Sequence, residues 1–197
     1  VYKRQDLSYP MTRPAALRLG VPARGMLTHL TLAQLLAPDR LVPGRRRDVD
    51  VLLAWGRRPS ALRVERLARQ WDLPVWHLED GLLRSVAKGR EHPPLCLLVD
   101  ELGVHFDATG PSRMEQLIAA PITAAEADRA WALQRRWCEQ RLSKVNPPVE
   151  AEAPQEPYVL VVDQSAGDRS IALGLADARC FQRMLQAALE ELSLIHI

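Results

Sequence analysis

The stretch "VDVLLAWGRRPSALRVERLARQWDLPVWHLEDG" (residues 49–81) decides the fold of this chain. Residues 49–56 are mostly apolar, which is typical of a strand buried on both faces. Residues 57–71 place apolar side chains at helical spacing, so they predict an amphipathic helix. Residues 73–78 form a second apolar run of strand length. Strand, helix and strand at this spacing predict a parallel βαβ unit with a right-handed crossover.

Polar side chains crowd the segment "EDGLLRS" (residues 79–85), which is expected to be the exit loop of the second strand. Ligands of open parallel sheets bind beyond the carboxyl ends of the strands, so these side chains are candidate substrate ligands. Arginine is suited to carboxylates and phosphates. A solvated loop with a local ion pair explains the same residues. The candidates are Glu79, Asp80, Gly81, Arg84 and Ser85.

The next segment predicts a hairpin and two capped helices. Residues 93–108 are expected to hold two short strands around a turn at residues 101–103. Helix N-termini are marked by Ser or Thr followed three positions later by Glu, the capping box. The two predicted boxes pair Ser112 with Glu115 and Thr123 with Glu126.

A proline-rich segment divides the chain, and the pattern of strand and helix begins again after it. Residues 147–157 lack periodicity and predict an interdomain linker. Residues 158–162 are expected to form another buried strand, "DQSAGDRSIALG" (residues 163–174) its exit loop, and residues 177–192 a helix. The sequence therefore predicts an α/β fold with a first Rossmann-like domain over 6–146 and the start of a second over 158–191.

Both termini are expected to be artificial. Residues 1–5 and 192–197 resemble translations of a transposon end used in sequencing libraries, so they are interpreted as adapter scars around a fragment. The whole chain has a formal net charge of +2, and setting aside Lys3 and Arg4 leaves 24 basic and 24 acidic side chains. A nucleic-acid-binding domain is therefore disfavoured.

Other site chemistry is weak or missing in the sequence. The three cysteines form no CxxC pair, so neither a disulfide framework nor a zinc site is indicated. No GxGxxG, P-loop, HExxH or GxSxG motif occurs. His77 is interpreted as a core or edge histidine rather than a base, and "GRRR" (residues 44–47) as a solvated loop rather than a phosphate or lipid ligand. Asp168 is either a catalytic carboxylate or a helix or turn cap. The residues alone indicate two α/β units around a polar cleft.

Six strings in order resemble the capsular polysaccharide biosynthesis proteins that act as retaining β-Kdo transferases (Kdo is 3-deoxy-D-manno-octulosonic acid). The strings are "AWGRRPSA", "PVWHLEDGLLRSV", "PPLCLLVDELGVHFDATGPSRMEQLI", "LSKVN", "VLVVDQSAGDRSIALG" and "FQRMLQAAL". The similarity runs from about Asp50 to Leu189. The combination of "LEDGxxRS" with "DAxxPSxxEQL" is specific to that family.

The resemblance implies a GT-B-like architecture, in which two Rossmann-type domains flank a cleft. It implies CMP-Kdo as donor, no metal or other cofactor, and transfer to a Kdo acceptor on a lipid of the lyso-phosphatidylglycerol type. It also implies a cytoplasmic protein peripheral to the inner membrane, working with capsule assembly and export proteins and not with nucleic acid. The alternative is a non-catalytic assembly or binding module of capsule production.

The resemblance also implies roles for individual residues. Asp168 matches the aspartate of the second-domain loop and is expected to be the nucleophile, because retention is most simply achieved by two inversions through a glycosyl-enzyme intermediate. Gln164 is expected to bind the donor or orient Asp168, and Ser170 to contact substrate. The residues of the 79–85 loop are expected to face acceptor or sugar, with Arg84 against a Kdo carboxylate.

Two departures from the family pattern concern fine specificity. Gly167 stands where relatives often have Asn or Asp, and "VHFDA" replaces a more usual tyrosine pair. The family's nucleotide-binding His-Pro motif is expected beyond Glu191. The isolated 197-residue fragment is therefore predicted not to bind CMP-Kdo productively.

Overall fold

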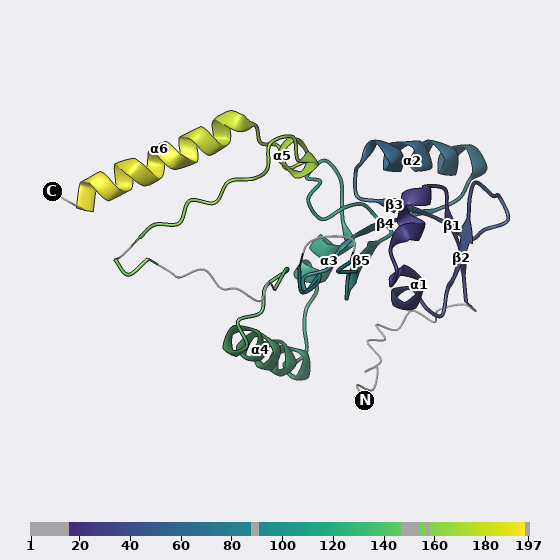
Figure 1. The fold of residues 1–197 in the computed structure, drawn as a ribbon, viewed down its shortest axis with the longest axis horizontal. Coiled ribbons are helices and arrows are strands. Elements are labelled where there is room, and N and C mark those ends of the chain that lie inside the picture. The colour runs from purple at the N-terminus through teal and green to yellow at the C-terminus, as the bar shows by residue number, and fades with distance from the viewer. Residues whose placement is uncertain (1–15, 88–90, 147–153, 157, 196–197) are drawn as a thin grey trace.

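A five-stranded sheet forms the centre of the chain, with strand order β2-β1-β3-β4-β5 (Figure 1). The structure is a computed structural model and describes residues 16–87, 91–146, 154–156 and 158–195. Strands β1 to β4 pair in parallel, and β5 is antiparallel to β4. The strand bounds are β1 Arg18–Val21, β2 Arg40–Pro43, β3 Val51–Trp55, β4 Val75–Asp80 and β5 Leu97–Asp100.

Helices cover both faces of the sheet, and four further helices, α3 to α6, follow it in the described chain. One face is covered by α2, and the other by η1 and α1 (Figure 1). The sheet therefore has the layered arrangement expected of a parallel α/β unit. The helix bounds are η1 Arg24–Thr28, α1 Leu32–Leu35, α2 Pro59–Trp71, α3 Arg113–Ala119, α4 Ala124–Glu139, α5 Arg169–Leu173 and α6 Ala178–Ile195.

Strand β3 is buried along its whole length because each of its faces meets a different layer. Leu53 and Trp55 pack with the residues of η1 and α1. Leu52 and Ala54 point the other way and pack against α2. This period of two places a continuous apolar run in the middle of a two-sided core. The predicted buried strand, the helix after it and the parallel βαβ unit are confirmed.

The first half departs from the predictions at two places. Strand β4 continues through Asp80, so Glu79 and Asp80 belong to the strand and not to its exit loop. The predicted second strand after the turn at 101–103 is wrong, because residues 104–108 form turns and irregular chain without strand pairing. The carboxylate of Asp100 accepts hydrogen bonds from the backbone N–H groups of Leu102, Gly103 and Arg113 at 2.8–2.9 Å. These hydrogen bonds hold residues 102–103 and the start of α3 against Asp100, so the chain does not continue into another strand.

Both predicted capping boxes are confirmed. Ser112 begins α3 and Thr123 begins α4, each with its reciprocal Glu115 or Glu126 partner. Ser112 is only 1% exposed, whereas the Thr123 box lies at the surface. The same local motif therefore stands in two different environments.

The second half forms the predicted helix but not the predicted strand. Residues 158–162 pair with no strand of the described chain, and Leu160 is 74% exposed. An apolar run becomes a strand only when neighbouring strands satisfy its backbone, and the described sheet ends at β5. Helix α6 confirms the later prediction, and α5 forms inside the segment expected to be a loop. Figure 1 shows α6 extending away from the sheet.

The predicted linker and adapter segments fall largely outside the described residues. Residues 1–5, 147–153, 157 and 196–197 are not described. Residues 154–156 belong to no helix or strand, and residues 192–195 are the last turn of α6. The domain boundaries proposed from the sequence stay predictions.

Candidate functional site

A pocket of about 480 Å³ lies beyond the carboxyl ends of β1 and β3. The strand order changes direction between these two strands, since β2 lies beyond β1 and β4 lies beyond β3. Such a switch point is where open α/β sheets bind ligands. Ala23 lines the pocket from the segment after β1, and Trp55 and Arg58 line it from the end of β3. The ring of His29 stacks on that of Trp55 with centroids 4.7 Å apart.

The predicted ligands after β4 form an internally bonded loop. Arg84 donates from Nε to Asp80 Oδ2 at 3.0 Å and from Nη1 to Ser85 Oγ at 2.7 Å. Ser85 is 3% exposed, and its Oγ donates to the carbonyl of Ala87. This is the local ion pair that the sequence offered as the alternative to substrate binding. Arg84 nevertheless also lines the switch-point pocket.

The segment "LSKVN" (residues 142–146) holds this loop in place. The carbonyl of Lys144 accepts the backbone N–H groups of Arg84 at 2.8 Å and Ser85 at 3.3 Å. Asn146 donates its backbone N–H to the carbonyl of Ser85 at 3.1 Å. Gly81 lies so close to Cys96 that a Cβ would meet the sulfur and backbone of that cysteine. Gly81 is therefore required by packing.

Glu79 lies at the end of β4 with its carboxyl group against Gly56. Burial raises the pKa of Glu79, and the neighbouring Asp80 charge raises it further, while Arg58 and Lys144 act in the opposite direction. Gly56 has φ +49°, and a Cβ there would meet the Glu79 carboxylate. A glycine is needed at this position both for the backbone conformation and for the space that Glu79 fills.

A buried polar network fixes the turn after β3. Arg57 donates to Asp107 Oδ2 at 2.8 Å and to Glu65 Oε1 at 2.7 Å. His77 Nδ1 lies 3.1 Å from the carbonyl oxygen of Gly56, and burial lowers the pKa of His77. His77 is 7% exposed, which confirms the prediction of a core histidine. The network holds Arg57 inward and leaves the next residue, Arg58, exposed at the N-cap of α2.

The three predicted residues of the second half lie together. Asp168 is the N-cap of α5, and its Oδ1 accepts the backbone N–H of Ser170 at 2.8 Å. The amide Nε2 of Gln164 lies 3.4 Å from Ser170 Oγ and donates to it. The backbone and hydroxyl hydrogen bonds of Ser170, followed by the charge of Arg58, lower the pKa of Asp168. Asp168 is thus an exposed carboxylate that stays ionised at neutral pH.

Arg58 connects the two groups of candidate residues. Its positive charge acts on the carboxyl groups of both Glu79 and Asp168. The backbone N–H of Ala108 donates to the carbonyl oxygen of Leu173 at 2.9 Å, which joins α5 to the first half of the chain. The charge of one arginine thus reaches a carboxyl group in each of the two acidic segments.

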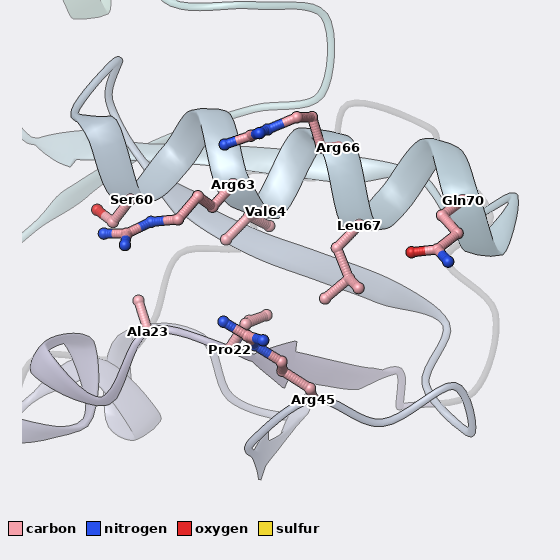
Figure 2. Close-up of a pocket in the computed structure, with 9 residues that line it drawn as sticks. All are labelled: Pro22, Ala23, Arg45, Ser60, Arg63, Val64, Arg66, Leu67 and Gln70. Carbon is pink, nitrogen blue, oxygen red and sulfur yellow. The ribbon is translucent and has the colours of Figure 1, made fainter.

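Two further pockets are relevant to the candidate residues. One of about 790 Å³ includes Gln164 and Asp168 and is lined only by residues between positions 161 and 185. Another of about 540 Å³ lies under the flank of α2 (Figure 2). This α2 pocket shares Ala23 and Ser60 with the switch-point pocket, and it is lined by Arg45, Arg63 and Arg66 but by no carboxylate.

Sequence reasoning missed Arg58, His29 and Trp55 as candidate ligands. Arg58 was placed inside the helix predicted over residues 57–71, although in the structure it is the residue before α2. The other two meet only because β1 and β3 are neighbours in the sheet. The one available signal was that "GRRPS" directly follows a buried strand, as "EDGLLRS" does.

Among the described residues, no group of three His, Cys, Asp or Glu side chains is placed to hold a metal ion, and no helix is long and apolar enough to cross a bilayer.

The comparisons with known proteins all indicate proteins of capsule or lipopolysaccharide synthesis. The family described as "Capsule polysaccharide biosynthesis protein" matches residues 50–142. The capsule polysaccharide modification protein LipA of Neisseria meningitidis serogroup B is 35% identical over 183 residues, which are 87% of this chain and 26% of LipA. The lipopolysaccharide-processing protein LpsZ of Rhizobium meliloti is 38% identical over 113 residues, which are 53% of this chain and 26% of LpsZ. The chain thus spans about a quarter of these curated relatives.

Two solved structures of Thermosulfurimonas dismutans KpsC share the fold. The β-Kdo 2,4 transferase superposes with a TM-score of 0.78 at 36% identity, covering 88% of this chain and 57% of that one. The β-Kdo 2,7 transferase has a TM-score of 0.53 at 21% identity, covering 79% of this chain and 51% of that one, and shows the fold alone. The predicted α/β, GT-B-like fold class is confirmed. The matched family, the relatives and the shared fold confirm the predicted resemblance to the capsule polysaccharide biosynthesis proteins.

Proposed function

We propose that the protein containing this chain is a retaining β-Kdo transferase of capsule synthesis, with CMP-Kdo as donor and a lipid-linked Kdo as acceptor. The observation that carries the proposal is the ionised, exposed Asp168 beside Gln164 and Ser170, in a chain 36% identical to a β-Kdo 2,4 transferase. The proposed reaction needs no metal. We place it at the cytoplasmic face of the inner membrane, where capsule assembly and export proteins would receive the product.

The proposed chemistry has two displacements at one carbon. In the first, a carboxylate oxygen of Asp168 bonds to the anomeric carbon of Kdo while the bond from that carbon to the CMP phosphate oxygen breaks, and CMP leaves with the electron pair. In the second, an acceptor hydroxyl oxygen bonds to the same carbon, the bond to Asp168 breaks, and the hydroxyl proton passes to solvent. Two inversions restore the original configuration.

The side chains near Asp168 fit supporting roles in this scheme. The backbone N–H of Ser170 orients Asp168 and keeps it ionised at neutral pH. Gln164, which donates to the Ser170 hydroxyl, is placed to position the donor or the nucleophile. A charged carboxylate is the form required for attack, so the lowered pKa suits a nucleophile rather than a proton donor.

Replacing Asp168 by asparagine tests its proposed role as nucleophile separately from its role as helix N-cap. Asn is as good an N-cap as Asp, so Asp168→Asn preserves α5 while removing the attacking oxygen anion. In the full-length protein we expect Kdo transfer from CMP-Kdo to fall by at least about a thousandfold, with the unfolding temperature nearly unchanged. Asp72→Asn is the matched control, since Asp72 is exposed and lies outside the three pockets described above. Unchanged turnover of Asp168→Asn would remove the nucleophile, and no transfer by wild type would favour a non-catalytic assembly module.

A further inference from the structure

Positive charge gathers on the outer side of α2 and on the loop that joins β2 to β3. The residues responsible are exposed arginines that form no ion pair with a carboxylate among the described residues: Arg45, Arg47, Arg63, Arg66 and Arg69. We call these five arginines the α2 basic face. Those on α2 recur at every third position, so their side chains project from one side of the helix. The guanidinium of Arg47 lies over the ring of Trp71, 5.6 Å from its centroid, which packs the loop against the end of the helix.

The acidic side chains next to the α2 basic face are paired elsewhere or stand at its edge. Glu65 is the one carboxylate of α2, and it accepts from Arg57 at 2.7 Å with its side chain 16% exposed. Asp48 in the loop pairs with Arg46 at 2.8 Å. Asp72 follows the helix as its C-cap. Because the whole chain has a formal net charge of only +2, this face is a local concentration of positive charge and does not follow from the composition.

The α2 pocket lies within this face. Arg45 and Arg63 line it together with the apolar side chains of Val64 and Leu67. Figure 2 shows Arg63 projecting from α2 and Arg45 from the loop opposite, on two sides of the pocket. Guanidinium groups bind phosphate oxygens through paired hydrogen bonds. A recess that combines two such groups with apolar walls therefore suits a ligand with a phosphate and an apolar part.

We infer that the α2 basic face docks on the surface of a membrane that contains anionic phospholipids, with one headgroup phosphate between Arg45 and Arg63. A basic side chain near such a surface strengthens binding about fivefold. Leu62, which is 42% exposed on α2, is placed to enter the headgroup layer beside the arginines. This inference rests on the proposed function, because it names the surface by which the protein would reach a lipid-linked acceptor.

A membrane fits the α2 basic face better than a nucleic acid does. Single-stranded nucleic acids bind by stacking their bases on exposed aromatic rings. The ring of Trp71 at this face is covered by the guanidinium of Arg47 and is not free for a base. The exposed apolar side chain on the face is that of Leu62, which suits a lipid layer.

Sedimentation of the 197-residue chain with lipid vesicles tests the inference. The probes are vesicles of phosphatidylcholine alone and vesicles of equal parts phosphatidylcholine and phosphatidylglycerol. We expect binding to the anionic vesicles, and we expect it to disappear in about 1 M salt, where charges are screened. The double variant Arg45→Gln/Arg63→Gln should bind them about 25-fold more weakly, at about fivefold for each arginine. Arg129→Gln/Arg135→Gln removes the same charge from exposed positions of α4 and is the matched control, which should bind like the wild type.

Several results would overturn the assignment. These are equal binding to the neutral and anionic vesicles, no vesicle binding, equal losses in the two double variants, or displacement of the vesicles by single-stranded RNA or by inorganic phosphate. Circular dichroism melts of both variants exclude misfolding as the cause. In the full-length protein, Arg45→Gln/Arg63→Gln should weaken Kdo transfer to a vesicle-borne acceptor more than transfer to a soluble Kdo glycoside. Arginine-dependent vesicle binding without any transfer by the wild type would refute the proposed function alone, whereas transfer with arginine-independent vesicle binding would refute this inference alone.

Discussion

The backbone N–H of Ala108 donates a hydrogen bond to the carbonyl oxygen of Leu173 across 2.9 Å. The donor lies in the turn after β5, and the acceptor is the last residue of α5, whose N-cap is Asp168. This bond joins α5 to the turn that contains Asp107, the carboxylate partner of Arg57. It therefore links the folding of the first α/β unit to the geometry of the candidate nucleophile.

Removing the N–H of Ala108 should loosen α5. Ala108→Pro lacks the donor, whereas Ala108→Gly keeps it and serves as the control. We expect faster hydrogen exchange across residues 169–173 in the proline variant and a loss of about 1 kcal/mol locally. In the full-length protein, Kdo transfer should fall in the proline variant. Identical exchange in the two variants would contradict a role for this bond.

The turn after β3 should tolerate no side chain at position 56. Gly56→Ala meets the Glu79 carboxylate and must adopt φ +49°, so we expect a loss of about 1–3 kcal/mol in the free energy of unfolding. Gly110→Ala is the matched control, since a Cβ there meets nothing within 4 Å. Urea denaturation of both variants measures the difference. A Gly56→Ala variant as stable as Gly110→Ala would show that the turn rearranges freely.

The Arg57 network should matter far more to stability than a surface ion pair. Arg57→Gln leaves Asp107, whose side chain is 4% exposed, without its cation, and we expect a loss of about 3 kcal/mol. Arg18→Gln removes an exposed pair with Asp48, whose side chains are 47% and 46% exposed, and should cost less than about 1 kcal/mol. Chemical denaturation at low and high salt compares the two. Equal losses would refute the burial argument.

The two capping boxes should differ in their effect on global unfolding. Ser112→Ala removes a buried cap and should lower the free energy of unfolding by about 1–2 kcal/mol. Thr123→Ala removes the same motif from α4, whose residues are all at least partly exposed, so we expect fraying of α4 with a smaller global effect. Hydrogen exchange of α4 and urea midpoints separate these outcomes. A larger global loss for Thr123→Ala would be inconsistent with the packing described.

Burial of His77 predicts acid sensitivity. Its folded-state pKa is lowered, so below about pH 6.5 the unfolded chain binds a proton that the folded chain does not. Stability from this residue is present above about pH 6.5 and is lost as the pH falls toward the folded-state pKa, at no more than about 1.4 kcal/mol per pH unit. His77→Gln should flatten the dependence between pH 7.5 and 5. His105→Gln, at an exposed site, should change it less, and equal curves for wild type and His77→Gln would contradict the prediction.

The local sequence pattern was enough to predict those elements whose interacting residues lie close together in the chain. The two-sided apolar run of β3, the stripe of α2 and the Ser112 and Thr123 boxes depend on neighbours a few residues away. The grouping of Gln164, Asp168 and Ser170 was also readable, because one short loop and one helix turn contain all three. By contrast, residues 158–162 carry a strand pattern but no described partner, and so do not form one.

The sequence by itself determined the α/β class, the parallel unit and the identity of the polar residues after its strands, because these follow from periodicity and local hydrogen bonding. Only the tertiary structure decided which of those residues face a ligand. Strand order placed Ala23 beside Trp55 and Arg58 at the switch point, and the Asp80 carboxylate holds the Arg84 guanidinium in an ion pair. Pairing across a sheet and competition for counter-ions depend on contacts between distant segments, which no local pattern encodes.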